Sequence, residues 1–209
     1  MTGSGNRTRA AWDKRYSTNE YAYGVYPNAF LSASIAKLDM RANGQRVLCL
    51  AEGEGRNAVY LATLGYDVTA MDQSRVGLEK AEQLATKRGV DLAIECGDLG
   101  NYQPESNGYH LVTMIWAHAS ASVRKNSYRI VDQALKAGGH LILEGYVPSQ
   151  ATRHTGGPSQ PDYMFTLKEL RANFPSYEFI IEQELTRDVQ EGRFHTGLGD
   201  VVQVLARKS

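Results

Sequence analysis

The chain has 209 residues, enough for one domain that buries a sizeable hydrophobic core. Lysine and arginine together number 23, as do aspartate and glutamate, so the formal net charge is zero. A neutral balance excludes the strongly basic surface that is typical of proteins that bind nucleic acid or anionic membranes, and we expect neither partner.

The amino terminus and the cysteines indicate where the protein resides. The opening residues, MTGSGNRTRA, lack the apolar core of a signal peptide, and no later apolar run reaches the length of a membrane span. Cys49 and Cys96 fall in strand-like apolar runs and have none of the spacings of metal ligands, so we expect two buried free thiols and no metal site. We therefore expect a cytoplasmic protein.

Apolar runs and helical patterns alternate along the first two thirds of the chain. Predicted strands cover residues 46–51, 67–71, 92–95, 110–116 and 140–145. Predicted helices cover residues 57–64, 74–88 and 123–137, and each stops at a glycine that suits a helix end. Such alternation is typical of a parallel sheet with helices on both faces.

The alternation of strands and helices ends after the fifth predicted strand. Thr166 and Glu169 form a capping-box pattern, so a helix begins there and ends before Pro175. Two further strands are predicted at 177–185 and 200–207, joined by fourteen residues that contain no helical pattern. A connection without a crossover helix favours an antiparallel pair. The predicted fold is α/β, with a doubly wound seven-stranded sheet that ends in an antiparallel hairpin.

A glycine-rich turn follows the first predicted strand. The letters GEGRNA, residues 53–58, match the pattern G-x-G-x-x-A of nucleotide-binding loops. Asp72 ends the next strand, nineteen residues after Gly53, where an acid can accept hydrogen bonds from ribose hydroxyls. The alternative is a tight strand-to-helix turn that binds nothing.

Acidic residues beside this turn distinguish between cofactors. A dinucleotide places a pyrophosphate against such a loop, where Glu52 and Glu54 would meet a like charge. S-adenosylmethionine carries an ammonium and a sulfonium instead, and the two glutamates favour that ligand. Asp98 follows the third strand and is placed to accept a hydrogen bond from the adenine amino group, with a turn or helix cap as the alternative.

These residues resemble the motifs of the class I S-adenosylmethionine-dependent methyltransferases over most of the chain. The resemblance implies a Rossmann-like core over 41–209 after an N-terminal segment, 1–40, within a single methyltransferase domain. LKAGGHLILEGY, residues 135–146, is similar to the family's turn into its fifth strand. Ala51 stands where the family usually has an acid. The cofactor-binding residues that the resemblance implies in this core are Glu52, Gly53, Gly55, Asn57, Asp72, Gln73, Asp98, Leu99 and Trp116.

The amino-terminal segment narrows the resemblance. WDKRYSTNEYAYGVYPNAFL, residues 12–31, is similar to the thiopurine methyltransferase type, and GEGRNA is similar to small tellurite-resistance-type methyltransferases. In such enzymes the leading segment covers the cofactor as a lid. The resemblance places Trp12, Tyr16 and Tyr23 near the sulfonium, which aromatic faces attract. The alternative is that these rings only dock a leading helix.

The catalytic residues are harder to predict. His118, Tyr146 and His195 are weak candidates, because they lie at or beyond strand ends where ligands bind in open α/β sheets. The loop 147–163 is long enough to suggest a function. Methyl transfer needs a general base only when the acceptor must lose a proton, and no catalytic triad is recognisable.

The sequence thus predicts an enzyme that methylates a small acceptor, with a sulfur, selenium or tellurium nucleophile suggested by the resemblance. Methylation of oxygen or nitrogen on a small metabolite is the nearest alternative. A nicotinamide-dependent reductase and a non-catalytic adenosylmethionine-binding protein are more distant ones. We expect a monomer or a homodimer.

Overall fold

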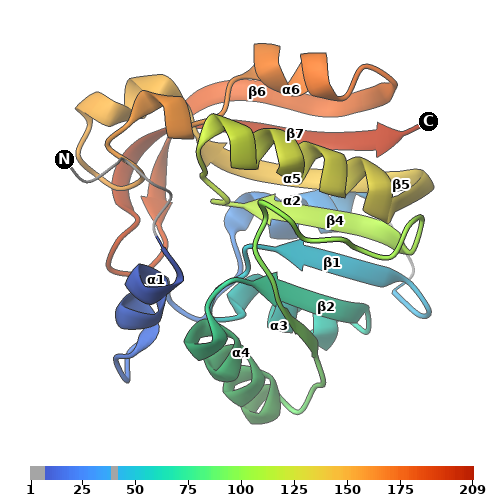
Figure 1. Cartoon of the computed structure of the whole chain (residues 1–209), viewed down its shortest axis with the longest axis vertical. Helices are drawn as coiled ribbons and strands as arrows, with labels where there is room; N and C mark the ends of the chain where they lie inside the picture. The colour runs from blue at the N-terminus through green and yellow to red at the C-terminus, as the bar shows by residue number, and fades with distance from the viewer. Residues whose placement is uncertain (1–7, 39–41) are drawn as a thin grey trace.

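A seven-stranded sheet forms the centre of the computed structural model, which describes residues 8–38 and 42–209 (Figure 1). Its strand order is β3-β2-β1-β4-β5-β7-β6. The strands are β1 (Arg46–Leu50), β2 (Asp67–Asp72), β3 (Ala93–Cys96), β4 (Tyr109–Ile115), β5 (Leu135–Tyr146), β6 (Tyr177–Gln190) and β7 (Thr196–Lys208). The order reverses between β1 and β4, and a crevice for ligands forms at such a switch point, outside the carboxyl ends of the strands.

The direction of the strands confirms the predicted fold class. β1 pairs in parallel with β2 and β4, and parallel pairing continues to β3 on one side and β5 on the other. β7 runs antiparallel to both β5 and β6, so the sheet is mixed only at its C-terminal edge. The central strand β1 is buried on both faces, and its residues 47–50 form a continuous apolar run.

Helices cover both faces of the sheet. They are α1 (Arg9–Tyr16), α2 (Ala29–Leu38), α3 (Arg56–Thr63), α4 (Arg75–Arg88), α5 (Ala121–Ala134) and α6 (Leu167–Asn173). Two short 3-10 helices, η1 (Pro148–Thr152) and η2 (Pro161–Tyr163), follow β5. In the described chain, none of the helices has the length and apolarity that crossing a membrane requires.

Local signals set several helix ends as predicted. The Ser74 hydroxyl accepts the Gly77 N–H at 3.1 Å and begins α4, and Gly89 ends it in the left-handed region. The Thr166 hydroxyl accepts the Glu169 N–H at 3.2 Å, which confirms the capping pattern at the start of α6.

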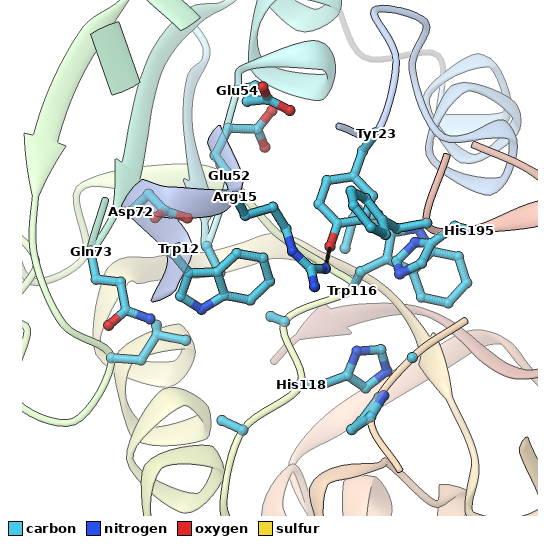
Figure 2. A pocket seen from close by; sticks show the side chains of 18 of the residues that line it. Trp12, Arg15, Tyr23, Glu52, Glu54, Asp72, Gln73, Trp116, His118 and His195 are labelled. Atoms are coloured by element: carbon cyan, nitrogen blue, oxygen red, sulfur yellow. Dashed lines mark hydrogen bonds between the residues drawn. The ribbon is translucent and has the colours of Figure 1, made fainter. Parts of the chain in front are cut away.

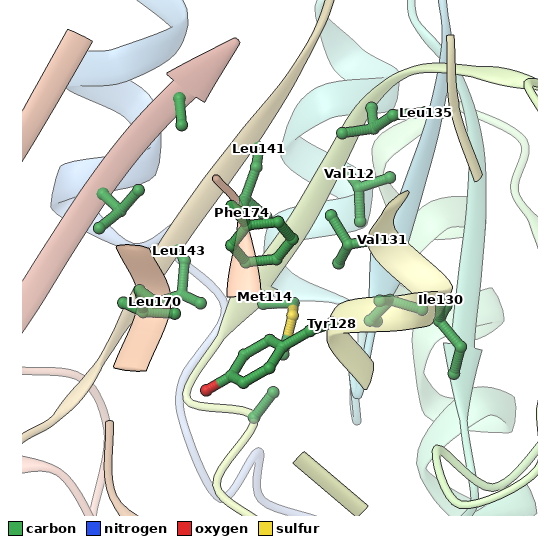
Figure 3. Packing of buried hydrophobic residues seen from close by; sticks show 14 of the residues in the cluster. Val112, Met114, Tyr128, Ile130, Val131, Leu135, Leu141, Leu143, Leu170 and Phe174 are labelled. Atoms are coloured by element: carbon green, nitrogen blue, oxygen red, sulfur yellow. The ribbon is translucent and has the colours of Figure 1, made fainter. Parts of the chain in front are cut away.

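Two apolar clusters hold the helices to the sheet. Figure 3 shows one of them, in which α5 and α6 lay Tyr128, Val131 and Leu170 against the side chains of β4 and β5. Phe30 and Leu31 of α2 pack with residues of α3 and α4 on the opposite face. Apolar packing on both faces therefore holds β1 and β4, the strands of the switch point, in place.

Three expectations about the elements were wrong in detail. The hairpin strands are longer than predicted, so only residues 191–195 connect β6 to β7 instead of fourteen. Helix α5 ends at Ala134, and the predicted stop at Gly138–Gly139 lies within β5, where the pairing to β4 shifts register. Cys49 is a buried free thiol as predicted, but Cys96 is exposed, because the four-residue strand β3 is an edge strand. The predicted boundary between residues 40 and 41 lies outside the described residues.

Candidate active site

A cavity of about 470 Å³ lies at the carboxyl ends of the parallel strands (Figure 2). Ala51, Asp72, Gly97 and Trp116 line it from the ends of β1, β2, β3 and β4. α1 and the hairpin connection 191–195 also contribute to its wall, although they are far apart in sequence. The predicted site residues that line the cavity are Trp12, Tyr16, Tyr23, Glu52, Asn57, Asp72, Gln73, Asp98, Leu99, Trp116, His118 and His195.

Three predicted site residues do not line the cavity. Gly53 and Gly55 belong to the glycine loop itself, and both have positive φ values, +65° and +88°. A Cβ on Gly55 would lie 2.5 Å from the Cβ of Ala81 in α4, which only glycine avoids. Tyr146 is fully buried behind Trp116, with 4.4 Å between the ring centroids. The glycines therefore shape the loop, and Tyr146 supports the wall.

The side chain of Glu52 caps the amino-terminal end of α3. Its Oε1 accepts the N–H groups of Asn57 and Ala58, each at 2.9 Å. Its Oε2 has no hydrogen-bond partner in the described residues, and the side chain lines the cavity. Burial raises the pKa of Glu52 to about 7, because the two N–H donors and Arg56 only partly offset desolvation. A cation in the cavity would stabilise its ionised form.

Asp72 links the ends of two strands. Its Oδ2 accepts the Gly53 N–H at 2.9 Å, and its Oδ1 accepts the Ser74 N–H at 2.8 Å. Burial raises the pKa of Asp72 to about 6. Asp72 thus positions the glycine loop as well as lining the cavity, so its removal would disturb both functions.

Glu54 anchors the amino-terminal segment and differs in this from Glu52. Its Oε2 accepts the Ala22 N–H at 2.7 Å, and its Oε1 forms an ion pair with Lys80 of α4. Lys80 also donates to the backbone oxygens of Thr18 and Glu20, at 2.9 and 2.7 Å. The expectation that both glutamates serve a cationic ligand therefore needs revision, because Glu54 already has a cation as its partner.

Asp98 and Leu99 form the outer end of the cavity beyond β3. The Asp98 carboxylate accepts the Gly100 N–H at 2.7 Å, and its backbone oxygen accepts the N–H groups of Asn101 and Tyr102. Asp98 therefore caps the turn after β3 and also lines the cavity. Its side chain is exposed, so the second carboxylate oxygen is accessible to a ligand.

Aromatic rings close the opposite end of the cavity. We call Tyr23, Trp116, Phe194 and His195 the aromatic end; the ring of His195 lies 4.7 Å from that of Tyr23 and 4.8 Å from that of Trp116. Figure 2 shows Tyr23, Trp116 and His195 across the cavity from Asp72 and Gln73. Trp116 adopts φ of +58°, an uncommon conformation for a tryptophan, and its Nε1–H donates to Glu191 at 2.6 Å. The indole is therefore held in one orientation.

The histidines of the cavity are neutral at physiological pH. The Nε2 of His118 accepts the Tyr146 N–H at 2.7 Å, and desolvation lowers the pKa of His118 to about 3. Burial likewise places the pKa of His195 well below its usual range. Among the described residues, the buried Nδ1 of His195 has no hydrogen-bond partner. Neither ring is a strong base.

Two residues of the cavity wall, Arg15 and Phe194, were not predicted from the sequence. The segment 156–160 also lines the cavity. Arg15 lies beside Tyr16 in the pattern WDKRY and three residues after Trp12, and this helical spacing from two predicted cofactor residues could have indicated it. The segment 156–160 lies in the long loop 147–163 that was suspected of a function. Phe194 precedes His195, and no motif in the sequence points to it.

Comparison with known proteins agrees with this geometry. A family model described as a methyltransferase domain matches residues 47–139. The uncharacterized methyltransferase YbaJ of Bacillus subtilis is 29% identical over 66% of this chain and 60% of its own length. TehB of Haemophilus influenzae, a probable S-adenosyl-L-methionine-dependent methyltransferase, is 23% identical over 65% of this chain and 46% of its own length. Residues 47–139 thus match a methyltransferase domain, and both relatives support a class I S-adenosylmethionine-dependent methyltransferase.

Solved structures place the methyltransferase fold over almost the whole described chain. The crystal structure of Haemophilus influenzae TehB aligns with a TM-score of 0.70 at 18% identity, over 96% of this chain and 67% of that one. A structure titled for the conversion of a disulfide bond into a thioacetal group during echinomycin biosynthesis aligns with a TM-score of 0.74 at 18% identity, over 97% and 93%. The chain spans 60% of the length of YbaJ and 46% of the length of TehB, the two curated relatives.

Proposed function

We propose that this methyltransferase transfers the methyl group of S-adenosylmethionine to a small, soft nucleophile, such as a thiolate, a selenolate or a tellurium anion. The observation that carries the acceptor class is the lack of a suitable base at the aromatic end, within the described residues. His118 has its acceptor nitrogen bonded to backbone, and the pKa of His195 lies well below neutrality. An acceptor that is already anionic needs no base.

The residues at the other end of the cavity fit the methyl donor. Glu52 offers an unpartnered carboxylate oxygen to the methionine ammonium, and Asp72 offers remaining lone pairs to the ribose hydroxyls. Asp98 and Leu99 offer a carboxylate and an apolar face to the adenine. A cavity of about 470 Å³ is within the size range of small-molecule sites.

The protein's contribution to the reaction is then positioning and exclusion of water. When bound, adenosylmethionine supplies a methyl group activated by its positive sulfur. Trp116 is held by Glu191 and forms a rigid wall, and Tyr23 and His195 pack around it. A soft anion placed between these rings meets an apolar, poorly hydrated surface, which leaves it reactive toward an in-line methyl group.

Two further facts support a small sulfur-type acceptor. The donor and acceptor share one cavity of about 470 Å³, which leaves little space for a macromolecular segment. The relative of known fold whose title names disulfide-to-thioacetal conversion acts in sulfur chemistry. Methylation of oxygen or nitrogen is the second candidate, and the unpartnered Nδ1 of His195 is the observation that favours it.

A pH series with acceptors of different acidity tests the acceptor class. With aryl thiols, we expect kcat/KM at saturating donor to rise with pH up to the pKa of each thiol and then to level off, so that the midpoint moves with the acceptor. His195→Gln should reduce the rate less than about tenfold, whereas loss of a general base costs about 100-fold or more. A midpoint that stays the same for every acceptor, or a loss above 100-fold in His195→Gln, would favour the oxygen or nitrogen alternative.

Donor binding should also depend on pH, because of Glu52 and Asp72. Their pKa values, about 7 and about 6, are raised in the free protein, so protons must leave before Glu52 can pair with the ammonium and Asp72 can accept hydrogen bonds from the ribose as a carboxylate. We expect S-adenosylhomocysteine to bind about tenfold more tightly at pH 8 than at pH 6, with release of protons. Calorimetry in two buffers of different ionisation enthalpy measures both; uptake of protons, or affinity that is constant over this range, would contradict the assignment.

A further inference from the structure

The cavity contains one guanidinium that no carboxylate neutralises. Two arginines line it, Arg15 and Arg56, and Arg56 forms a buried ion pair with Glu191. Across residues 8–38 and 42–209, no acidic side chain pairs with Arg15; its Nη1 donates to the hydroxyl of Tyr23 at 2.6 Å. Because His118 and His195 are neutral, Arg15 is the cation of the described cavity wall that remains available to a ligand.

Aromatic faces hold this guanidinium in place. Arg15 lies in the last turn of α1, and its Cζ is 4.2 Å from the ring centroid of Phe194 and 5.4 Å from that of Trp12. Stacking contacts use the faces of a guanidinium and leave its N–H groups, which lie in its plane, available for hydrogen bonds. Figure 2 shows the side chain reaching between Trp12 and the aromatic end, at the middle of the cavity.

The charges of the wall are separated in space. Glu52 and Asp72 lie by the glycine loop, whereas Arg15 extends from the covering helix α1. A ligand that presents a positive group to the loop and a negative group to α1 would match both. Within a desolvated cavity, an unpaired charge is costly, and a ligand of opposite charge that pairs with it gains affinity and orientation.

We propose that Arg15 is the anion-binding residue of this site, which takes a negatively charged group of a bound substrate. Two sources carry that chemistry: the α-carboxylate of the donor's methionine moiety, and the anionic nucleophile of the acceptor. In the first case α1 closes on the donor through a charge-assisted hydrogen bond, and in the second Arg15 selects anionic acceptors over neutral ones. The inference rests on the proposed function, because it assumes an adenosyl donor in this cavity.

Calorimetry with two adenosyl ligands separates the sources. S-adenosylhomocysteine carries the carboxylate, whereas 5′-methylthioadenosine lacks the whole amino-acid end. If Arg15 binds the carboxylate, Arg15→Gln weakens binding of S-adenosylhomocysteine by about 10- to 100-fold and leaves methylthioadenosine within about threefold. If Arg15 binds the acceptor, both ligands keep their affinity, and kcat/KM for an aryl thiolate falls by about 10- to 100-fold instead.

Two variants serve as controls. Arg15→Lys keeps the charge but not the planar fork, so we expect an intermediate loss. Arg9→Gln removes an exposed arginine of the same helix that does not line the cavity, and it should behave as the wild type. Wild-type affinity for both ligands together with unchanged turnover in Arg15→Gln would overturn the inference and leave the proposed function standing. Failure of the wild-type protein itself to bind either adenosyl ligand would overturn both.

Discussion

Replacing Arg187 with methionine is expected to lower the free energy of unfolding by about 3–5 kcal/mol. The Arg187 guanidinium donates to both carboxylate oxygens of Glu144, at 2.7 and 2.8 Å, and to Glu191 at 2.6 Å. Glu144 is fully buried in β5, and without Arg187 its charge would lose its ionic partner. The remaining donors to Glu144, the amides of Asn28 and Gln203, are neutral.

This network joins four parts of the chain around the site. Asn28 at the start of α2, Arg56 at the start of α3, Glu144 in β5 and the hairpin residue Glu191 meet in one buried cluster. Glu191 is also the acceptor for the Trp116 indole, so the cluster fixes a wall of the cavity. We therefore expect Arg187→Met to weaken ligand binding as well as folding.

Chemical denaturation of Arg187→Met beside Arg75→Met measures the stability effect. Arg75 forms an exposed pair with Glu79 at 3.4 Å within α4, and such a pair contributes about 0.5 kcal/mol or less. Equal losses in the two variants would mean that the buried network adds nothing to stability. The arginines hold the pKa of Glu191 at about 2, so its share of the stability should be present above pH 4.5 and disappear as the pH falls toward 2.

Gly55→Ala is expected to cost about 2–4 kcal/mol and to abolish ligand binding. The added Cβ would lie 2.5 Å from the Cβ of Ala81 and 2.7 Å from its Cα, and the residue would have to keep φ near +88°. Relief requires the glycine loop to move away from α4, which displaces Glu52 from the cavity wall. Thermal melting and titration with S-adenosylhomocysteine give the two readouts.

Gly89 provides the matched control for this substitution. It has a similar φ of +70° at the end of α4, but a Cβ there meets nothing within 4 Å. Gly89→Ala should therefore cost only about 1 kcal/mol and leave binding intact. Adding Ala81→Gly to Gly55→Ala should recover part of the loss. A Gly55→Ala variant that is as stable as Gly89→Ala would show that the loop does not need its close approach to α4.

Features that depend on neighbours in sequence were predictable. The glycine turn, the Ser74 cap and the capping pattern at Thr166 are local, and each appears where the sequence placed it. The antiparallel end of the sheet followed from a connection that contains no helical pattern. The length of that hairpin was not predictable, because the end of β6 carries the exposed polar side chains of Thr186, Asp188 and Gln190 on an edge strand, and such a pattern is typical of a loop.

Features that depend on distant partners were not predictable from the residues alone. Glu52 and Glu54 look alike in the sequence, yet Glu54 pairs with Lys80, which comes from helix α4. Arg15 stacks on Phe194, which lies at the other end of the chain and arrives only through the hairpin. No role was predicted for Glu191, because its contact with Trp116 exists only in the folded network.

Calorimetric titration of the wild-type protein with S-adenosylhomocysteine, run beside NAD and NADP, tests whether this cavity binds an adenosyl methyl donor. We predict selective micromolar binding of the adenosyl ligand at pH 8, with neither dinucleotide bound. Absence of adenosyl binding, or equal affinity for a dinucleotide, would contradict it, because Glu52 and Asp72 would then line this cavity without a cationic ligand to meet them.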